Sequence, residues 1–460
     1  MKNITIENIV NICNGSLYGR EWVKDNNKEA AGVVLDSRLL EQDYIFIATK
    51  GEKADGHTFI PSVFAKGALA VICEEIPEEI IGPCIQVKNS FTALRKLAAF
   101  YRSQLSLKVV GITGSVGKTS TKEFVAGVLS AKYNVWKTQG NFNNEVGLPL
   151  TVLQLRDEHE IAVLEMGISD FGEMHRLSEI AKPDICVLTN IGQCHLEFLG
   201  DRDGVLKAKT EIFDFMNPDG KIFVNGDDDK LITLKEKWKE KLVTFGRGKE
   251  NDIVAAGEIS KGLLGSVADI RGRITLDQVL IPLPGEHMVL NALAAGAVAD
   301  FFGLDAKEIK AGMKQVKAVS GRSNIISFRD IVLIDDCYNA NPVSMKAAID
   351  LLQSANGRKV AILGDMFELG EEEKKLHYEV GKYTAGQVDL LLCVGNLSKS
   401  LYEGAMEERT KHTENIYLTK KEDIYSLLEE KIMPQDTILL KASHGMGFSD
   451  IVTWFQKMYS

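Results

Sequence analysis

The chain has 460 residues, of which 45% are apolar and 26% are charged, and its formal net charge is −10. A length above the ~250–300 residues at which single cores stop growing predicts two to four domains. The acidic balance argues against nucleic-acid binding, because proteins that bind nucleic acids carry a basic footprint.

The N-terminus and the cysteines indicate the compartment. The opening MKNITIENIVNICNG has one early lysine and no apolar core ending in small residues, which is not the pattern of a signal peptide. No segment approaches the ~18 uninterrupted apolar residues of a spanning helix. The seven cysteines are scattered without a CxxC pair, which suits a reducing compartment and predicts neither disulfides nor a zinc site. We therefore expect a cytoplasmic protein without membrane insertion.

The first part of the chain, residues 1–88, predicts a small mixed α/β domain. Short strand-like runs such as YIFIAT (44–49) precede an alanine-rich stretch, VFAKGALAVI (63–72), which we expect to be helical. A helical pattern, FTALRKLAAFYRSQ (91–104), follows it. The boundary of the first domain is therefore expected near residue 88.

The rest of the chain predicts two further α/β domains. Over residues 89–317 the strand-like runs LKVVGIT, IAVLEMG, DICVLTN and KIFVNGD alternate with helical patterns, which predicts a parallel sheet covered by helices on both faces. Residues 318–460 repeat this alternation with IVLIDD, KVAILGD, LLLCVG and TILLKAS, which predicts a Rossmann-like domain. Each run ends in a polar or glycine-bearing tip, where open parallel sheets place ligands. The charged stretch LKEKWKEKL (234–242) is expected to be a solvated helix face.

The stretch GITGSVGKTSTKEF (111–124) predicts a phosphate-binding loop. Gly114 and Gly117 allow backbone N–H groups to turn toward phosphate oxygens at the start of a helix. Lys118 is expected to reach the terminal phosphates, and the Thr119 hydroxyl to hold Mg²⁺. The spacing is unusual, because five residues instead of four separate the upstream glycine from Gly117. The alternative is a structural strand-turn-helix corner that happens to contain Gly-Lys-Thr.

Two later strand ends offer further metal ligands. Glu165 closes the run IAVLE, where an acidic residue can coordinate Mg²⁺ directly or through water. His195 follows another strand tip in a glycine-bearing loop. A lone histidine is more often structural, and this alternative stays open, but its position at the ligand edge favours a binding role.

These segments resemble one known family along the whole chain. GITGSVGKTS satisfies the form G-x-T-G-[ST]-x-G-K-T-[ST] of the Mur ligases, and this family pattern explains the unusual spacing. The other similar segments are DSR (36–38), GEKADGHTF (51–59), TQGNFNNEVGLPLT (138–151), NIGQCHLEFLG (190–200), AKTEIF (208–213), PGEHMVLNALAA (284–295), GRS (321–323), LIDDCYNANPVSM (333–345) and ILGDMFELG (362–370). The resemblance is closest to the family members that add a dipeptide.

The resemblance implies an ATP-dependent amide ligase with three domains and an acyl phosphate intermediate. Residues 1–88 would bind a uridine nucleotide substrate, 89–317 would bind ATP, and 318–460 would complete the ATP site. The implied substrates are UDP-N-acetylmuramoyl-tripeptide and D-alanyl-D-alanine, and the implied state is a monomer. Because two domains would contact ATP, we expect hinge closure near residues 314–322.

The resemblance also assigns roles to individual residues. Those implied in ATP binding are Gly114, Ser115, Gly117, Lys118, Thr119, Ser120, Asn291 at the adenine, Arg322 at the phosphates, and Asp336 or its neighbour Asp335 at the ribose. Those implied in holding two Mg²⁺ ions are Thr119, Glu165, His195 and Lys209. The implied catalytic residues are Lys118, His195 and Lys209. Those implied in substrate binding are Ser37, Arg38, Asp55, His57, Asn141, Asn143 and Asn144.

Several alternatives stay open. Lys209 stands where the family carries a carbamylated lysine, but it could be an unmodified surface or phosphate-contacting lysine. Asn291 could instead cap or pack a helix. Near the C-terminus the dipeptide-adding enzymes read K-G-S-R-x-M, whereas this chain has Ala442 and His444 in place of the glycine and arginine. The alternative functions are another Mur-type ligase, of the diamino-acid-adding or folylpolyglutamate type, and a nucleotide-dependent switch.

Overall fold

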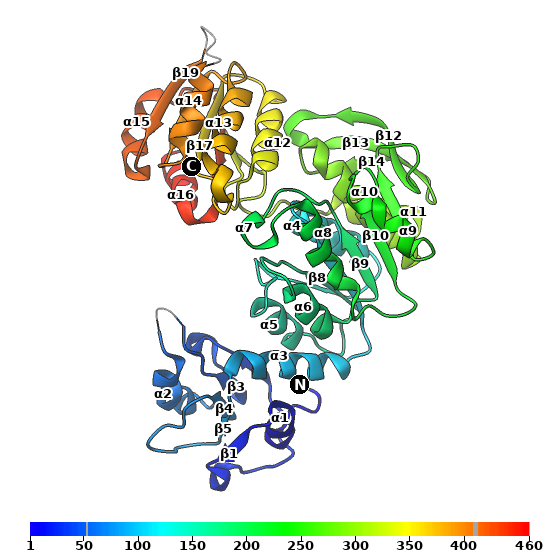
Figure 1. The fold of residues 1–460 in the computed structure, drawn as a ribbon, viewed down its shortest axis with the longest axis vertical. Helices are drawn as coiled ribbons and strands as arrows, with labels where there is room; N and C mark the ends of the chain where they lie inside the picture. The colour runs from blue at the N-terminus through cyan, green and yellow to red at the C-terminus, as the bar shows by residue number, and fades with distance from the viewer. Residues whose placement is uncertain (52–53, 408–412, 460) are drawn as a thin grey trace. The chain divides into compact units, whose positions relative to one another are not determined.

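Three sheets carry the fold of the chain (Figure 1). A computed structural model describes residues 1–51, 54–407 and 413–459. Five strands lie between residues 16 and 86, nine between 108 and 281, and six between 324 and 441. One sheet therefore falls in each of the three regions expected from the sequence, and the predicted α/β architecture is confirmed. Glu52 and Lys53 of the GEKADGHTF segment lie outside the described residues.

By internal packing, the chain divides into two compact units. The first unit comprises residues 1–113, 133–186 and 209–221. The second unit comprises residues 114–132, 187–208 and 222–460. The phosphate loop and the whole C-terminal sheet thus belong to the same unit.

The N-terminal region is a mixed sheet with three helices. Its strands are ordered β1-β5-β4-β3-β2, and only β1 is antiparallel to its neighbour. The elements are α1 (Ile6–Cys13), β1 (Ser16–Tyr18), β2 (Gly32–Val34), β3 (Tyr44–Ile47), α2 (Ile60–Ala65), β4 (Ala70–Cys73), β5 (Cys84–Gln86) and α3 (Ser90–Ser103).

The expected helix over residues 63–72 is wrong in its second half. Helix α2 ends at Ala65, and Gly67 follows with φ +95°, a conformation that stops a helix. The next apolar run, Ala70–Cys73, is buried at every position and forms β4. A short, continuously apolar run is typical of a strand buried on both faces.

The central region begins in the first unit with a parallel group of strands in the order β7-β8-β6. Its elements are β6 (Lys108–Thr113), β7 (Val135–Lys137), α5 (Gly147–Leu153), β8 (Ile161–Glu165) and α6 (Glu173–Ala181). One of the boundaries between the two units falls within β9 (Ile185–Leu188), and the others follow residues 113, 132, 208 and 221. Every side chain of β8 is buried, as expected for a central parallel strand.

The central region continues in the second unit with strands in the order β10-β11-β12-β13-β14. Strands β10 to β12 are parallel, whereas β12 to β14 are antiparallel, which corrects the expectation of a purely parallel sheet. Short turns join these last strands and leave no room for a crossover helix. The elements are α4 (Lys118–Leu129), α7 (Leu196–Leu199), α8 (Arg202–Thr210), β10 (Lys221–Asn225), α9 (Lys235–Trp238), β11 (Leu242–Gly246), β12 (Ile253–Ser260), β13 (Ser266–Gly272), β14 (Leu276–Ile281), α10 (Glu286–Phe301) and α11 (Ala306–Lys314).

The C-terminal region is a six-stranded sheet in the order β15-β16-β20-β17-β18-β19, with only β15 antiparallel. This arrangement matches the expected Rossmann-like architecture. The elements are β15 (Asn324–Ser327), β16 (Val332–Asp335), α12 (Pro342–Gln353), β17 (Lys359–Gly364), α13 (Glu373–Thr384), β18 (Leu390–Val394), α14 (Ser398–Glu407), β19 (Glu414–Leu418), α15 (Ile424–Lys431), β20 (Thr437–Lys441) and α16 (Ser449–Tyr459).

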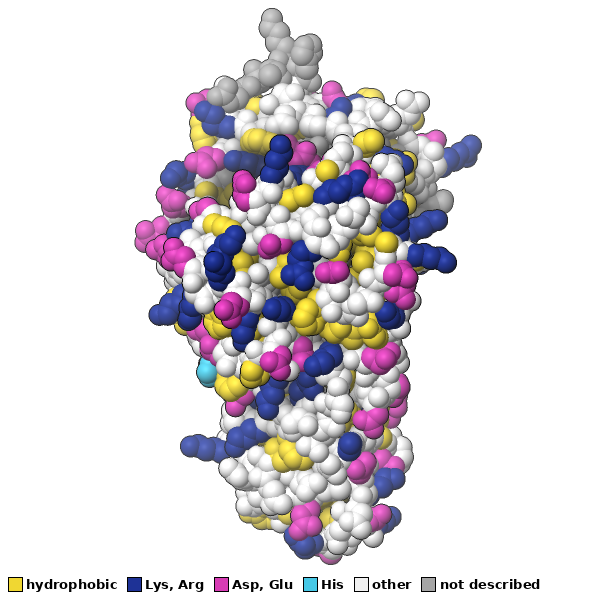
Figure 2. All heavy atoms as spheres, turned by 90° about the vertical axis from the view of Figure 1, so that its right-hand side faces the viewer, with side chains coloured by type: hydrophobic (Ala, Val, Ile, Leu, Met, Phe, Trp, Pro, Cys, Tyr) yellow, Lys and Arg dark blue, Asp and Glu magenta, His cyan; other side chains and the backbone are white. Residues whose placement is uncertain are grey.

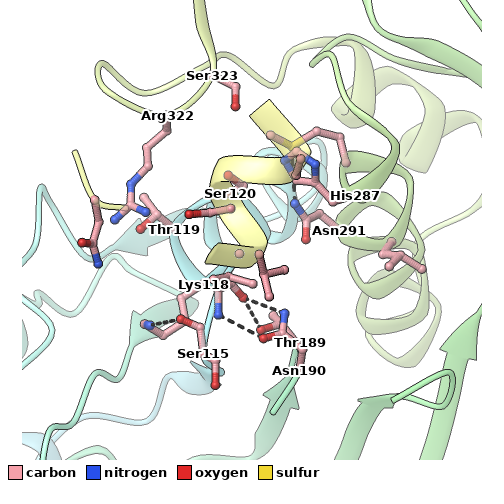
Figure 3. Close-up of a pocket in the computed structure, with 18 of the residues that line it drawn as sticks. Ser115, Lys118, Thr119, Ser120, Thr189, Asn190, His287, Asn291, Arg322 and Ser323 are labelled. Carbon is pink, nitrogen blue, oxygen red and sulfur yellow. Dashed lines mark hydrogen bonds between the residues drawn. The ribbon is translucent and has the colours of Figure 1, made fainter. Parts of the chain in front are cut away.

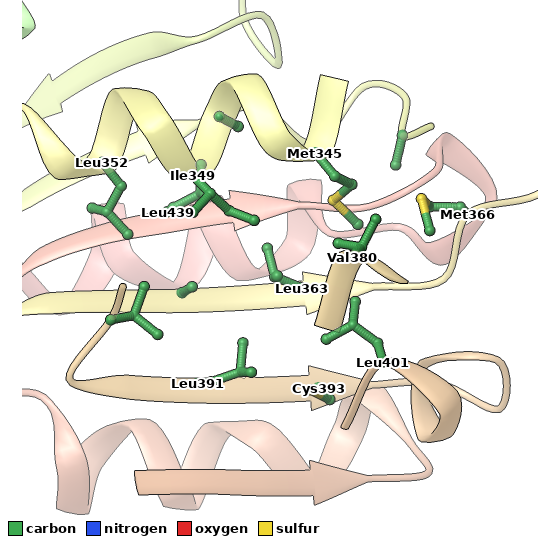
Figure 4. Packing of buried hydrophobic residues seen from close by; sticks show 14 of the residues in the cluster. Met345, Ile349, Leu352, Leu363, Met366, Val380, Leu391, Cys393, Leu401 and Leu439 are labelled. Atoms are coloured by element: carbon green, nitrogen blue, oxygen red, sulfur yellow. The ribbon is translucent and has the colours of Figure 1, made fainter. Parts of the chain in front are cut away.

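The C-terminal sheet is covered on both faces because its strands alternate. Ala361 and Leu363 of β17 pack with α12, α13 and α14, and Figure 4 shows Ile349 of α12 above the strands. Val360 and Ile362 pack on the other face with α15 and α16. A slip of one residue would exchange these two sets, so burial fixes the register of the strands. The ends of β16 and β20 therefore lie side by side in a fixed register.

The surface of the protein carries charges of both signs. On the face drawn in Figure 2, Lys and Arg side chains are interspersed with Asp and Glu. Among the described residues, no helix is long and apolar enough to cross a membrane.

Candidate nucleotide and metal site

The phosphate loop takes a shape that only glycine permits at two positions. Gly114 has φ +151°, and a Cβ atom there would lie 1.9 Å from the Thr189 hydroxyl oxygen. Gly117 has φ +83° and precedes the first residue of α4. The loop therefore runs from a buried strand directly into a helix N-terminus, the geometry in which backbone N–H groups attract anions.

A neighbouring segment holds the loop in this shape. Asn190 accepts hydrogen bonds from the Ser115 and Val116 backbone N–H groups at its backbone and side-chain oxygens, both at 3.0 Å. The Val116 carbonyl accepts bonds from the Thr189 hydroxyl at 2.6 Å and the Asn190 amide at 3.0 Å. A purely structural strand-turn-helix corner, the alternative reading of this segment, would not need these supporting hydrogen bonds.

The cationic group of the loop lies within the loop itself. Lys118 Nζ donates to the Gly114 carbonyl at 2.9 Å and approaches the Ser115 carbonyl at 3.5 Å. Thr119, in the first turn of α4, is buried, with 7% of its surface exposed. An ammonium and a hydroxyl therefore flank the helix N-terminus, as the sequence predicts.

A cavity of about 190 Å³ opens beside the loop and is lined by the central and C-terminal regions (Figure 3). Arg322 reaches from the C-terminal region toward Thr119 and Ser120. Residues of α10 line another side. The predicted residues that line the cavity are Ser115, Gly117, Lys118, Thr119, Ser120, Asn291, Arg322 and Asp336. The structure thus brings together almost all residues expected to bind ATP.

Arg322 is held by an aromatic side chain. Its guanidinium carbon lies 4.0 Å from the ring centre of Tyr338, a distance typical of a cation–π contact. The Tyr338 ring lies 5.3 Å from the ring of His444, the residue that departs from the family pattern. His444 therefore contacts the platform under Arg322.

The two neighbouring aspartates have different surroundings. Asp335 is 1% exposed and accepts hydrogen bonds from the Ser320 hydroxyl and the Gly321 N–H at 3.2 and 2.7 Å, so it shapes the turn before Arg322. Asp336 lines the cavity and forms a 2.6 Å ion pair with Lys441, which is 2% exposed. Of the two, Asp336 is the one at the cavity, and its ribose role stays a prediction.

Two residues of α10 face the cavity. The Asn291 carbonyl oxygen accepts a 2.9 Å bond from the Thr121 hydroxyl, which orients its amide group. Asn291 thus packs α10 against α4 and also lines the cavity, so the packing contact is present and the adenine role stays a prediction. His287 also lines the cavity, and burial lowers the pKa of its ring, which favours the neutral form.

One asparagine positions the carboxylate at the end of β8. Glu165 is 1% exposed, and its Oε1 accepts a 2.8 Å bond from the Asn143 amide. Asn144 accepts bonds from the Val146 and Gly147 N–H groups at 3.2 and 2.9 Å, so it shapes the turn that leads into α5. Asn141 is exposed. Of the three asparagines predicted to bind substrate, one orients a predicted metal ligand and one shapes a helix start.

Lys209 and His195, the remaining predicted metal ligands, have different surroundings. Lys209 is 1% exposed, which excludes the alternative of a surface lysine. His195 Nδ1 lies 3.0 Å from Glu368 Oε2. Among the described residues, no group of three or more His, Cys, Asp or Glu could hold a metal. A cation would take its other ligands from hydroxyl, phosphate and water, which is how Mg²⁺ is usually bound.

The N-terminal residues predicted to bind substrate sit in two short turns led by aspartates, residues 36–39 and 55–59. Asp36 accepts a bond from the Arg38 N–H, and its ion pair with the Arg38 guanidinium lowers the pKa of the Asp36 carboxyl to about 2. Ser37 offers its carbonyl to Lys66 at 2.8 Å.

The second turn is built in the same way. Asp55 accepts a 2.9 Å bond from the His57 N–H, which with the ring contact lowers the pKa of the Asp55 carboxyl. The His57 ring donates from Nδ1 to Asp55 at 2.6 Å and accepts from the Glu74 N–H at 3.0 Å with Nε2. The ring therefore connects Asp55 to the backbone at Glu74.

Sequence reasoning missed several residues of the site. Thr189 and Asn190 support the phosphate loop, and Lys441 lines the cavity beside Asp336. Each stands at or just after the end of a buried strand, β9 or β20, so the strand-end rule applied to them as well. Asn190 and Lys441 lie in segments that resemble the family, but the resemblance assigned them no role. By contrast, Asn339 was expected near the nucleotide, and it lines the cavity.

Comparisons with known proteins cover nearly the whole chain. Three family models match: "Mur ligase family, catalytic domain" over residues 29–102, "Mur ligase middle domain" over 112–299, and "Mur ligase, glutamate ligase domain" over 321–444. The UDP-N-acetylmuramoyl-tripeptide–D-alanyl-D-alanine ligase of Bacillus subtilis is 38% identical over 97% of both chains.

Solved structures agree with this result. A crystal structure of MurF from Acinetobacter baumannii is 31% identical, covers 98% of both chains and superposes with a TM-score of 0.88. The MurF ligase of Thermotoga maritima in complex with ADP is 31% identical over 93% of this chain and 97% of its own, with a TM-score of 0.77.

Proposed function

The chain belongs to the Mur ligase family, and we propose that it is the member that joins D-alanyl-D-alanine to UDP-N-acetylmuramoyl-tripeptide at the expense of ATP. The full-length similarity to a curated ligase of this name carries the proposal. The product is the UDP-N-acetylmuramoyl-pentapeptide used in peptidoglycan synthesis. The enzyme is an ATP-dependent ligase of acid and amine.

The reaction has two steps. The terminal carboxylate of the tripeptide attacks the γ-phosphorus of ATP, which gives an acyl phosphate and ADP. The amine of D-alanyl-D-alanine then attacks the acyl carbon, and phosphate leaves. Activation is needed because a carboxylate is a poor acyl donor, whereas phosphate is a competent leaving group.

The residues around the cavity divide the work of the first step. Lys118 exchanges its contact with the Gly114 carbonyl for the γ-phosphate and neutralises the charge that spreads over the transferring group. Arg322 supplies a second, permanently charged group from the C-terminal region. Asp336 receives the ribose hydroxyls, and Asn291 offers its amide to adenine.

Divalent cations fit the donors present. In the second unit, Thr119 and His195 would supply a hydroxyl and an imidazole, and in the first unit, Glu165 and a carbamylated Lys209 would supply a carboxylate and a carbamate oxygen. Two Mg²⁺ ions held there would stabilise the negative charge of the phosphates during transfer. Lys209 is buried, and a carbamate on it would be an oxygen donor suited to a divalent cation.

The N-terminal region receives the uridine nucleotide through Ser37, Arg38, Asp55 and His57. The enzyme works as a cytoplasmic monomer. Closure around the substrates occurs in residues 315–319, because Ser320 and Gly321 at the end of the expected hinge are already fixed to Asp335. Superimposable scattering profiles with and without ATP and UDP-substrate would rule out closure.

One assay tests the proposed reaction. ADP formation is measured with UDP-N-acetylmuramoyl-tripeptides that end in lysine or diaminopimelate, each with and without D-alanyl-D-alanine. We expect sustained release only when UDP-tripeptide and dipeptide are both present. Release with neither would indicate a switch, and release with a free amino acid would indicate another Mur-type ligase.

A second experiment tests the carbamate on Lys209. Lys209→Ala should abolish sustained ADP release, and short carboxylic acids added to this variant should restore part of it by replacing the missing carbamate. Full activity of Lys209→Ala would refute the proposed role.

A further inference from the structure

Two loops that are distant in the sequence meet at a histidine and a carboxylate. His195 belongs to the loop after β9, and Glu368 follows β17 of the C-terminal sheet. Their Nδ1 and Oε2 atoms lie 3.0 Å apart, and the side chains are 25% and 64% exposed. Exposed ion pairs contribute little to stability, so this contact has little value for folding alone.

The backbone at both residues adopts a rare conformation. His195 has φ +51° and Glu368 has φ +61°, in the left-handed region that non-glycine residues seldom occupy. Such a conformation is unfavourable for a residue with a Cβ atom. Strain of this kind persists where surrounding structure imposes it, and it is concentrated at functional sites. Both residues of the contact therefore have a strained backbone.

The His195 loop is fixed to the phosphate loop. The Gly192 N–H donates to the Ser115 hydroxyl at 2.8 Å, and the Ile191 N–H donates to Asp228 at 2.8 Å. The Cys194 thiol also lies 3.1 Å from the Ser115 hydroxyl. His195 therefore keeps its place relative to the phosphate loop.

The Glu368 loop is fixed to the C-terminal sheet. The Met366 N–H donates to His377 Nε2 at 2.8 Å, and the Phe367 N–H donates to the Ser443 hydroxyl at 2.9 Å. His377 is buried, and Ser443 follows β20. Glu368 therefore moves with the C-terminal region, and its contact with His195 depends on how that region is docked.

The chemistry of imidazole gives this contact a function. Histidines that bind metals usually direct their second ring nitrogen to a carboxylate or carbonyl, which fixes the tautomer and the ring orientation. Turned to accept a proton from Nδ1, the Glu368 carboxylate would leave the lone pair of Nε2 for a cation; the 3.0 Å contact in this structure does not itself have hydrogen-bond geometry.

We propose that Glu368 is a positioning residue that orients His195 for a divalent cation, so that the metal site is complete only while the C-terminal region is docked. This inference rests on the proposed role of His195 as a metal ligand. It adds a carboxylate from another region of the chain to that role, and it ties metal affinity to domain closure.

Binding of Mn²⁺ alone to the full-length protein tests the proposal without turnover. Free Mn²⁺ is counted by electron paramagnetic resonance for wild type, Glu368→Gln, Glu368→Gly and the control Glu371→Gln, which changes an exposed carboxylate in the same segment. Glycine adopts φ +61° without strain, so Glu368→Gly removes the carboxylate and keeps the backbone conformation. His195→Gln identifies the binding that depends on the imidazole.

We expect Glu368→Gly to weaken the His195-dependent Mn²⁺ binding about tenfold, as is typical when the partner of a metal-binding histidine is lost. Glu368→Gln should weaken it less, because an amide oxygen still accepts the Nδ1 proton. Glu371→Gln should bind like wild type. Equal affinities in Glu368→Gly and Glu371→Gln would overturn the proposal.

The tautomer of His195 gives an independent measurement. In ¹⁵N-histidine-labelled protein without metal, the signal lost in His195→Gln should report a protonated Nδ1 and an unprotonated Nε2. Glu368→Gly should shift this signal toward the Nε2-protonated form, and an unchanged tautomer would contradict the proposal. If wild type forms ADP with both substrates but His195→Gln binds Mn²⁺ normally, the inference fails while the ligase assignment stands.

Discussion

The phosphate loop and the two aspartate-led turns of the N-terminal region both fix a short segment, but they do so differently. The loop depends on the dihedral angles of Gly114 and Gly117 and on support from Thr189 and Asn190. In the turns, Asp36 and Asp55 hold the backbone with the side chains that are also expected near the substrate.

The difference has a practical meaning for mutagenesis. In the loop, removing the group that binds phosphate leaves most of the shape intact. In the turns, removing a residue such as His57 alters the fold and the expected substrate contact together. This difference can be tested by substitutions that separate a loss of activity from a loss of unfolding free energy.

Lys118→Met should nearly abolish activity. The ammonium stabilises charge that develops in the transition state, and losing one such donor costs at least about 100-fold in kcat. The free energy of unfolding should change little, because glycines and Asn190 shape the loop. Steady-state ADP formation and urea unfolding measure the two effects. A large loss of stability would show that Lys118 also shapes the loop, which would contradict the proposed difference between the loop and the turns.

Gly114→Ala should break the loop itself. The new methyl group would meet the Thr189 hydroxyl at 1.9 Å, so we expect a loss of about 2–4 kcal/mol of unfolding free energy together with nucleotide binding. Gly303→Ala is the matched control, because Gly303 also has a positive φ of 72° but no atom within 4 Å of the added carbon. Equal losses in both variants would mean that strain alone, and not the contact with Thr189, sets the cost.

Tyr338→Leu should weaken ATP binding without affecting the loop. Removing the ring from under Arg322 should raise the KM for ATP about fivefold to thirtyfold, equivalent to ~1–2 kcal/mol. Tyr338→Phe keeps a ring and should stay close to wild type. Equal KM values in the two variants would show that the platform does not position Arg322.

His57→Ala should lower stability as well as substrate affinity. It removes the acceptor of the Glu74 N–H, which should cost about 1–3 kcal/mol in urea unfolding. His159→Ala provides the control, since His159 also accepts a backbone N–H, from Arg156 at 2.9 Å, and has no predicted substrate role. An increased KM for UDP-tripeptide in His57→Ala but not in His159→Ala would assign substrate binding to the turn.

The smallest effect concerns pH and the buried His377. Burial lowers the pKa of the His377 ring below the ordinary 6.5. In addition, Nε2 accepts the Met366 N–H, and a protonated ring would lose this hydrogen bond. The unfolded chain then takes up a proton that the folded chain does not, so stability falls as the pH drops below 6.5. Urea unfolding from pH 7.5 to 5.5 should show this decline, and His377→Gln should flatten it. An unchanged slope would place the decline elsewhere.

Much of the architecture could be predicted because it depends on short-range patterns. The buried runs of β6, β8 and β17 and the helix α3 are continuous segments with a clear period. The error in residues 63–72 arose because alanine-rich and apolar runs suit both a helix and a buried strand. The antiparallel pairing of β13 and β14 could not be predicted, because turn-forming glycines near residue 262 do not indicate which strands pair.

The phosphate loop follows from the order of the amino acids, because strand, glycine turn and helix are consecutive and their chemistry is local. The rest of the site depends on how distant strands assemble into sheets. Asp336 and Lys441 are distant in sequence yet form a 2.6 Å pair, because β16 and β20 are neighbours in the C-terminal sheet. The contact between His195 and Glu368 likewise depends on docking of two regions, since its energy and geometry come from residues that no single segment contains.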